Sequence, residues 1–202
     1  MARRSSPEIN AGSMADIAFL LLIFFLVTTT METDMGISRK LPPIPEDNVE
    51  PPVIRQKNIF TVIVNRNNEL LVEDELMELS ELRQAAIEFL DNGGGVGEEA
   101  CDYCQGAGDP ASSDNPEKAI ISLVNDRMTE YRTYISVQNE LVAAYNELRN
   151  REAQRLYGTS FTQMEENYNS ANFRGDKETL KERIDVIKEM FPQKLSEAEP
   201  TR

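Results

Sequence analysis

One apolar segment, SMADIAFLLLIFFLVTTTM at residues 13–31, stands out from a chain in which polar and charged positions are otherwise frequent. Its uncharged part, residues 17–31, would give roughly 22 Å of helix, which is shorter than a hydrocarbon core of about 30 Å. A spanning helix therefore has to begin earlier, and the pattern predicts a transmembrane helix over residues 11–31. A cleaved signal peptide is the alternative, although an acid such as Asp16 inside the apolar region is unusual for one.

The charges that flank this segment predict its orientation. Arg3 and Arg4 precede it, whereas Glu32 and Asp34 follow it. Positively charged residues stay on the cytoplasmic side of a membrane helix. We therefore expect residues 1–10 in the cytoplasm and everything after the helix on the exported side.

The stretch that follows, ISRKLPPIPEDNVEPP at 37–52, holds five prolines between positions 42 and 52. Such a sequence cannot continue a helix and favours extended polyproline II geometry. Residues 32–57 are therefore predicted to form a semi-rigid linker between the membrane and a folded domain.

Residues 58–156 carry the patterns of a small α+β domain. The runs IFTVIV at 59–64 and ELLV at 69–72, separated by NRNN, predict a hairpin. A further strand is predicted over 119–124 (AIISLV), and a long helix over 129–156 completes a β-β-α-β-α order. The first helix of that order is predicted from apolar residues at helical spacing, before Asn92 and three glycines: Leu79, Leu82, Ala86, Phe89 and Leu90.

The remainder of the chain is predicted to be a C-terminal extension, residues 157–202, with one helix. Residues 158–175 look irregular, and the last helix begins at Asp176 as N-cap and stops at Pro192. The long helix over 129–156 and this last helix each have an apolar face: that of the long helix is expected to join the core, with a dimer or partner surface as the alternative, and that of the last helix packs on the domain or contacts another protein. The long helix places on its apolar face Tyr134, Val137, Leu141, Tyr145 and Leu148, and the last helix Leu180, Ile184, Ile187 and Phe191.

Composition and charge exclude some classes of function. The chain has 202 residues, no His and a formal net charge of −14 at pH 7. A chain this acidic offers no large basic surface for phosphates, so no nucleic-acid partner is expected. No phosphate-binding loop, nucleophile elbow or pair of catalytic carboxylates stands out, so we expect neither an enzyme nor a cofactor.

Asp16 is the candidate chemical group of the apolar segment. An ionised side chain near the centre of a membrane helix costs about 2.5–3.5 kcal/mol, so an acid there needs water, a polar partner or a proton. Such a carboxylate can pick up and release a proton, whereas an acid at the helix edge can simply extend into the headgroups. On a helix, Asp16 shares one stripe with four uncharged residues that we expect to face a partner: Leu20, Ile23, Val27 and Thr30.

The Gly-rich insertion at 93–117 contains both cysteines of the chain, Cys101 and Cys104. Its CDYCQGAG segment resembles one copy of the CxxCxGxG zinc-binding repeat of DnaJ-type chaperones. A structural zinc site uses four ligands, and this chain has two Cys and no His, so we expect no metal unless two chains share one. In an oxidising compartment a local Cys101–Cys104 disulfide in a flexible loop is expected, with a redox-active pair and a link between chains as alternatives.

The apolar segment resembles the transmembrane helix of the ExbD/TolR family, the small subunits of proton-driven inner-membrane motors in Gram-negative bacteria. The resemblance rests on MADIAFLLLIFFLVTTTM at 14–31, where a Met precedes the Asp and a Leu/Ile/Phe-rich run ends in Thr, and on LPP at 41–43. It implies that Asp16 carries protons in a single-pass helix of the inner membrane, with a periplasmic C-terminal domain. It also implies a homodimer inside a pentameric ring of an ExbB- or TolQ-like subunit.

The same resemblance extends more loosely to about residue 156, and two functions stay open. It implies a motor subunit that uses the proton motive force to energise a TonB- or TolA-like protein for outer-membrane transport or envelope maintenance, or that grips peptidoglycan. In the family a shorter helix leads to a final strand, so the long helix over 129–156 leaves the last strand of the sheet unassigned. The alternative is a signal-anchored periplasmic binding or redox module that acts through its CxxC loop.

Overall fold

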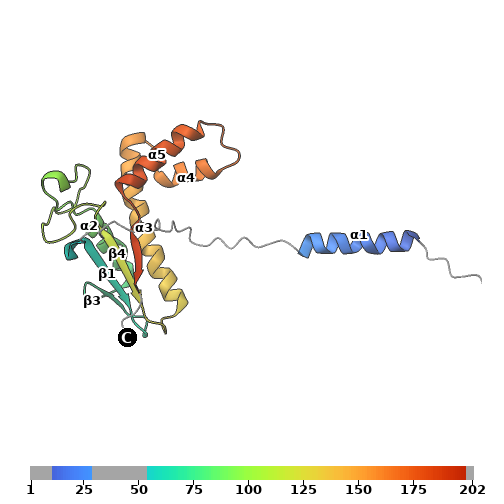
Figure 1. Cartoon of the computed structure of the whole chain (residues 1–202), viewed down its shortest axis with the longest axis horizontal. Coiled ribbons are helices and arrows are strands. Elements are labelled where there is room, and N and C mark those ends of the chain that lie inside the picture. The colour runs from blue at the N-terminus through green and yellow to red at the C-terminus, as the bar shows by residue number, and fades with distance from the viewer. Residues whose placement is uncertain (1–10, 29–53, 199–202) are drawn as a thin grey trace, which may run out of the picture. The chain divides into compact units, whose positions relative to one another are not determined.

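Figure 1 shows a computed structural model of the protein, which describes residues 11–28 and 54–198. The chain divides into two compact units, Met1–Glu50 and Pro51–Arg202. In the first unit the described residues form one helix, α1 (Ala11–Thr28). The second unit contains a mixed sheet and the remaining helices.

The sheet of the second unit has five strands in the order β3-β2-β1-β4-β5. The central pair, β1 and β4, is parallel, and β5 adds to β4 in parallel as well, whereas β2 and β3 pair antiparallel. Parallel neighbours need a crossover connection, and helices supply it in both cases. The strands are β1 (Ile59–Val64), β2 (Leu70–Val72), β3 (Glu75–Met77), β4 (Ile120–Asn125) and β5 (Leu195–Ala198).

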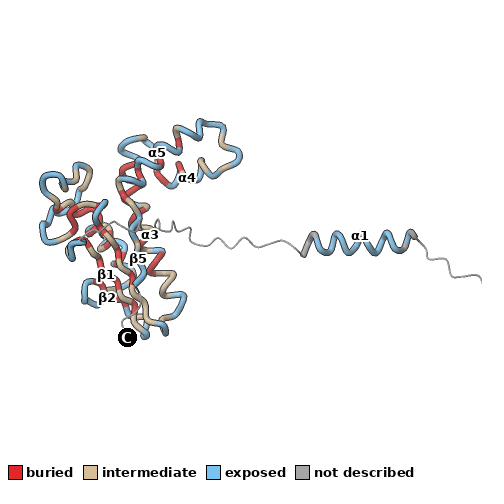
Figure 2. Tube along the Cα trace, viewed as in Figure 1, coloured by how far each residue is buried: buried red, intermediate tan, exposed pale blue. Residues whose placement is uncertain are grey.

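Helices cover one face of this sheet (Figures 1 and 2). Alternate residues of β1 are buried, as the pleat of a strand requires, and they pack against side chains of α2 (Leu79–Leu90) and α3 (Tyr131–Tyr157). Fully buried members of this core include Val62, Leu82 and Leu141. Burial of each such side chain contributes about 1.5–3 kcal/mol.

The opposite face of the sheet is also rich in aliphatic residues. The register places Ile59 beside Ile120 and Ile63 beside Val124, at positions that alternate with the buried ones. These four side chains are half-buried, and Leu76 at the β3 edge is 74% exposed. An apolar face that stays partly exposed in the single chain is typical of a surface that contacts another protein.

Two further helices, α4 (Phe161–Asn169) and α5 (Lys177–Met190), form a pair at the C-terminal end of α3 (Figure 1). They share a second, smaller core with α3, made of Ala153, Phe161, Met164, Leu180, Ile184 and Ile187. The chain then returns to the sheet as β5. Residues after α3 are therefore inserted between a helix and the last strand of the same sheet.

Several predicted elements are confirmed. Strands at 59–64 and 70–72, the helix that carries Leu82, the strand near 120 and the long helix occur as expected, within one or two residues. The last helix begins after Asp176, whose carboxylate accepts hydrogen bonds from the backbone N–H groups of Glu178 and Thr179 at 2.9 and 3.4 Å. The apolar faces of both long helices are buried, except that Tyr134 is half-buried.

Other predictions were wrong. Residues 158–175 contain α4, which has few apolar residues, so its helical pattern is weak without the second core. The extension after residue 157 therefore holds two helices, and its end, LSEA, forms β5 although none of its residues is β-branched. Strand β3 was missed because its turn uses Glu73 and Asp74 at positive φ (48° and 68°), where Gly or Asn is usual.

The predicted linker lies mostly outside the described residues, which resume at 54. Its last residues belong to the domain, because a short 3-10 helix (Gln56–Asn58) precedes β1 and Asn58 is buried. The domain therefore begins before the predicted position 58.

Candidate functional site

Helix α1 carries one ionisable residue, Asp16, among side chains that are apolar on all sides of the helix. Residues 14–25 of this helix are exposed, and Figure 2 colours the described part of α1 accordingly. Asp16, Leu20 and Ile23 follow each other at spacings of four and three residues, so they lie along one stripe of the helix. An acid among apolar side chains is a candidate for binding and releasing a proton, so Asp16 is the candidate functional residue of this unit.

Part of the predicted stripe is not described. The side chain of Val27 and the whole of Thr30 lie outside the described residues, as do residues 29–31 of the predicted span. Within residues 11–28 and 54–198, none of the helices combines the length and the apolar character that crossing a membrane requires.

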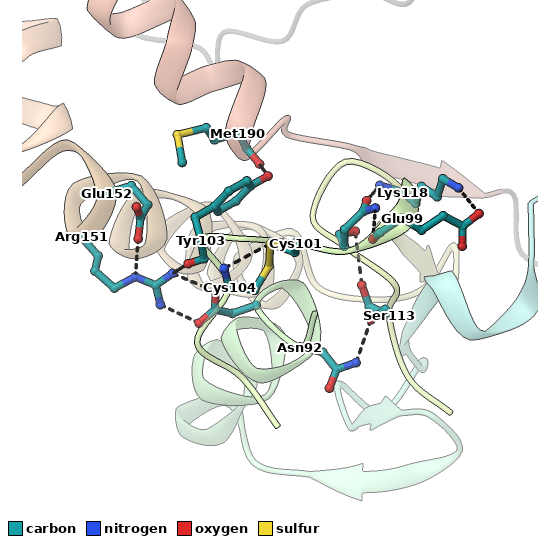
Figure 3. Close-up of a disulfide and its surroundings, with 12 residues drawn as sticks. Asn92, Glu99, Cys101, Tyr103, Cys104, Ser113, Lys118, Arg151, Glu152 and Met190 are labelled. Atoms are coloured by element: carbon teal, nitrogen blue, oxygen red, sulfur yellow. Dashed lines mark hydrogen bonds and ion pairs between the residues drawn. A yellow bond between two sulfur atoms is a disulfide. The ribbon is translucent and has the colours of Figure 1, made fainter. Parts of the chain in front are cut away.

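The second candidate region is the cysteine loop between α2 and β4 (Figure 3). A disulfide joins Cys101 to Cys104, with their Cα atoms 5.5 Å apart, and the Cys104 N–H donates to Cys101 Sγ at 3.1 Å. In the part of the chain that the structure describes, no group of three or more His, Cys, Asp and Glu side chains is placed to hold a metal ion.

Asn92 fixes the far side of this loop through its side-chain amide. The loop was predicted to be flexible, but the hydrogen bonds of Asn92 hold it to the end of α2. The Asn92 amide donates to the carbonyls of Asp109 (2.8 Å) and Ser113 (2.7 Å) and accepts from the Asp109 N–H (3.0 Å). Gly106 packs so tightly here that a Cβ atom would lie 2.5 Å from the Asp91 carbonyl oxygen. The loop is thus built on the end of α2.

Asp114 ties the same loop to the start of the domain. Its buried carboxylate accepts from Asn58 Nδ2 at 2.9 Å and pairs with Lys57 at 2.5 Å and Arg55 at 3.5 Å. Burial alone would raise the pKa of Asp114, but the hydrogen bonds from Lys57 and Asn58 and the two nearby cations outweigh it and hold the pKa below its usual value. This acid is a structural tether rather than a reactive group.

Tyr103, inside the disulfide ring, contacts the end of α5. Its hydroxyl donates to the Met190 carbonyl at 2.7 Å, and its ring packs edge-on against Phe191 with centroids 5.4 Å apart. Burial, with a smaller contribution from the charges of Glu117 and Glu152, raises the pKa of Tyr103 to about 12. The hydroxyl therefore stays protonated and remains a donor at neutral pH.

Helix α3 contributes arginines to the same place. Arg151 grips Asp91 through two hydrogen bonds (2.6 and 2.8 Å) and also contacts Glu152 at 3.1 Å, and Arg155 bonds the other Glu152 oxygen at 2.6 Å. Arg149, which is buried, donates twice to the Phe191 carbonyl, at 3.0 and 2.7 Å. These carboxylates are compensated by fixed cations, which favours a structural role.

The sequence did not single out Tyr103 or these arginines. The sequence feature that could have indicated the arginines is the run RNREAQR at 149–155. It places charged residues in the same helix as buried apolar residues such as Leu148 and Ala153. The structure brings the cysteine loop, α3 and the end of α5 together, whereas Asp16 belongs to the other unit of the chain.

Comparison with known proteins assigns the chain to a family through a region that contains α1 and four of the five strands. No curated protein matches the sequence. Residues 2–151 match the family described as biopolymer transport protein ExbD/TolR, and this match covers α1 through most of α3 but not α4, α5 or β5. Because the match spans well over half of the 202 residues, the chain belongs to the ExbD/TolR family of biopolymer transport proteins.

Proposed function

We propose that this protein is the small subunit of an inner-membrane proton channel that acts as a motor, with Asp16 as its proton-carrying residue. The observation that carries the proposal is that Asp16 is the sole ionisable group of α1, whose apolar sequence continues uncharged to Met31. Membership of a family of biopolymer transport proteins supports a role in transport rather than catalysis.

In this proposal residues 11–31 form a single transmembrane helix. The exposed apolar side chains of α1 support an environment of lipid or of other apolar helices. Arg3 and Arg4 before it favour a cytoplasmic N-terminus and a periplasmic domain. The partners that the family suggests are a second copy of the chain and a pentameric ExbB- or TolQ-like ring around the helices.

The mechanism follows from the charge change at Asp16. A proton that moves down its gradient releases about 2.3 kcal/mol per 100 mV, in addition to any pH difference. A protonated Asp16 tolerates an apolar wall of the ring, whereas an ionised one needs a polar or wet position. A helix that carries this acid prefers different positions in the two states, so repeated protonation and release can drive relative rotation. Leu20 and Ile23, on the same stripe, are proposed to face the ring.

The periplasmic domain would pass this motion on. A TonB- or TolA-like protein is the proposed recipient, with peptidoglycan as another point of attachment. The half-buried aliphatic face that contains Ile59, Ile63, Ile120 and Val124 supports contact of this domain with another protein chain, which we propose to be its second copy.

The test is proton flux into vesicles that contain the protein and its ring partner. We expect Asp16→Asn to reduce the flux to that of vesicles without the protein, at equal expression and assembly. Asp34→Asn is the matched control, because this acid follows the apolar segment, and it should leave the flux unchanged. Equal flux in native protein and Asp16→Asn would contradict the proposal.

The alternative, a periplasmic binding or redox module, is favoured by one observation, the disulfide in a loop that contacts α5. It predicts the reverse pattern of mutations. Cys101→Ser with Cys104→Ser would abolish function, while Asp16→Asn would leave it intact.

A further inference from the structure

The junction between α5 and β5, residues 190–195, is held from two sides. Tyr103 donates to the Met190 carbonyl, and Arg149 donates twice to the Phe191 carbonyl. Three residues after Phe191 the ladder with β4 begins, because the Ile121 N–H donates to the Lys194 carbonyl at 2.9 Å. The position of the last strand therefore depends on contacts made just before it.

Strand β5 itself is held by its ladder with β4 and by few buried side chains. It is short, it pairs with β4 at the edge of the sheet, and its burial pattern shows one half-buried residue, Leu195, followed by three exposed ones. Glu197 adds contacts to α3, where the Tyr134 hydroxyl and the Gln138 side-chain amide donate to its carboxylate at 2.6 and 2.7 Å. An edge strand with so little buried side chain opens easily once its flanking contacts weaken.

The disulfide lies in a short part of the cysteine loop, the part that contains Tyr103, whose carbonyl also accepts from Arg151 at 3.5 Å. Upstream, Glu99 is fixed by ion pairs with Arg55 and Lys118, and its carbonyl accepts from Asn115 Nδ2 at 3.0 Å. Downstream, the Gly106 N–H donates to the Asp91 carbonyl at 3.0 Å. Between these two anchors the Cys101–Cys104 bond closes a ring of four residues around Tyr103.

We propose that the Cys101–Cys104 disulfide is a reducible latch: the oxidised ring holds Tyr103 on the end of α5, and reduction by a dithiol releases Tyr103 and loosens the edge strand β5. Within the cysteine loop, the anchors at Glu99 and Gly106 confine the movement to the segment between them. Arg149 remains on the Phe191 carbonyl, so reduction loosens the strand without detaching it. This proposal does not rest on the motor function.

The reaction is thiol–disulfide exchange with a dithiol reductant. One thiolate of the reductant attacks Cys104 Sγ or Cys101 Sγ, the sulfur–sulfur bond breaks, and the leaving sulfur takes up a proton. The second thiol of the reductant then attacks the mixed disulfide. The products are two cysteine thiols in this protein and one disulfide in the reductant, so two electrons and two protons have moved to Cys101 and Cys104. Both cysteines are half-buried and Asp102 between them is exposed, which gives a reductant access.

The consequence lies at the open edge of the sheet. In the described residues β5 pairs with β4 alone, so a looser β5 alters the groups that this edge presents to a partner. Loss of the Tyr103 hydrogen bond is expected to raise amide exchange in residues 191–198 by about three- to tenfold, which corresponds to one ordinary hydrogen bond. Exchange in β1 and α2 should stay the same.

The experiment is hydrogen exchange with mass spectrometry on the full chain in detergent, with and without dithiothreitol as the dithiol. We expect dithiothreitol to reduce the bond in the folded protein and to raise exchange in residues 191–198 and in the loop segment 100–105, but not elsewhere in the domain. Tyr103→Phe, which removes only the hydroxyl, should raise exchange there in the oxidised protein and leave little further effect for the reductant. Asp102→Ala is the matched control, because its exposed side chain lies in the same ring, and it should behave like the native protein.

Two results would overturn the proposal. In one, residues 191–198 exchange at the same rate in the oxidised and reduced proteins. In the other, reduction raises exchange throughout the sheet, as a bond that merely supports the whole fold would do. A Cys101→Ser and Cys104→Ser variant should match the reduced protein, and the native protein with dithiothreitol gives the answer even if that variant fails to fold.

Discussion

Acidic side chains occupy two contrasting environments in this protein. Asp16 belongs to a helix with no other charged residue, whereas Asp91 and Glu152 in the folded domain are each held by arginines of α3. The ion pairs of Asp91 and Glu152 join α3 to its surroundings, whereas the sequence of α1 contains no basic residue that could pair with Asp16. The contrast separates the residue proposed to carry protons from residues that maintain structure.

The largest expected effect is a loss of proton flux with no change in the stability of the folded domain. Asp16→Asn should reduce proton flux to background and leave the urea midpoint of the folded domain unchanged, because α1 belongs to a separate compact unit. Flux in vesicles and unfolding followed by tyrosine fluorescence measure the two properties on one preparation. A shifted midpoint would show that Asp16 also supports the domain and would weaken the contrast.

The largest stability effect is expected at the end of α5. Phe191 is fully buried, packs against Tyr103, and belongs to the main core. Phe191→Ala should lower the free energy of unfolding by about 3–5 kcal/mol. Urea denaturation of the full chain in detergent checks this, with Val186→Ala, on an exposed position of α5, as a control that should cost far less.

A smaller effect is expected for the paired acid. Glu152→Gln keeps the shape of a fully buried side chain but removes the charge that Arg151 and Arg155 contact. Loss of these charge-assisted bonds should cost about 1–3 kcal/mol of stability, while proton flux of the assembled protein stays the same. A loss of flux in a variant that assembles normally would place Glu152 in the transport mechanism.

The smallest effect is a pH dependence that comes from Asp114. Its pKa is lower in the folded domain than in the unfolded chain, so its stabilising contribution is complete above about pH 4 and is lost as the pH falls through the folded-state value. Asp114→Asn should therefore reduce the drop in urea midpoint between neutral and acidic solution. Asp102→Asn, on an exposed position, should leave that drop unchanged.

Prediction from sequence succeeded where the apolar pattern was strong. Strand β1 and helix α2 were predicted because β-branched runs and helical spacing of Leu82, Ala86 and Phe89 carry the signal locally. Helix α4 and strand β5 were missed because neither has such a pattern. Phe161 and Met164 are the two buried residues of α4, and β5 is held by its ladder with β4. Both elements depend on partners that are distant in the chain.

The candidate sites also divide into features that a local sequence pattern reveals and contacts that only the fold brings together. Asp16 and the cysteine pair stand out in the sequence, because an acid in an apolar segment and a CxxC spacing are local features. The sequence could not show that Tyr103 reaches Met190 or that Arg149 caps the chain at Phe191, since these contacts join residues far apart in the chain.

The sequence by itself determined the apolar segment with its single acid, the proline-rich stretch, the first strands and the long helices, because each depends on residues that are neighbours in the chain. Only the tertiary structure decided that the C-terminal residues return to the sheet as β5, that α4 and α5 share a second core, and that the cysteine loop rests on the end of α5. These features arise from packing and hydrogen bonds between distant segments, and such contacts leave no periodic pattern in a single sequence.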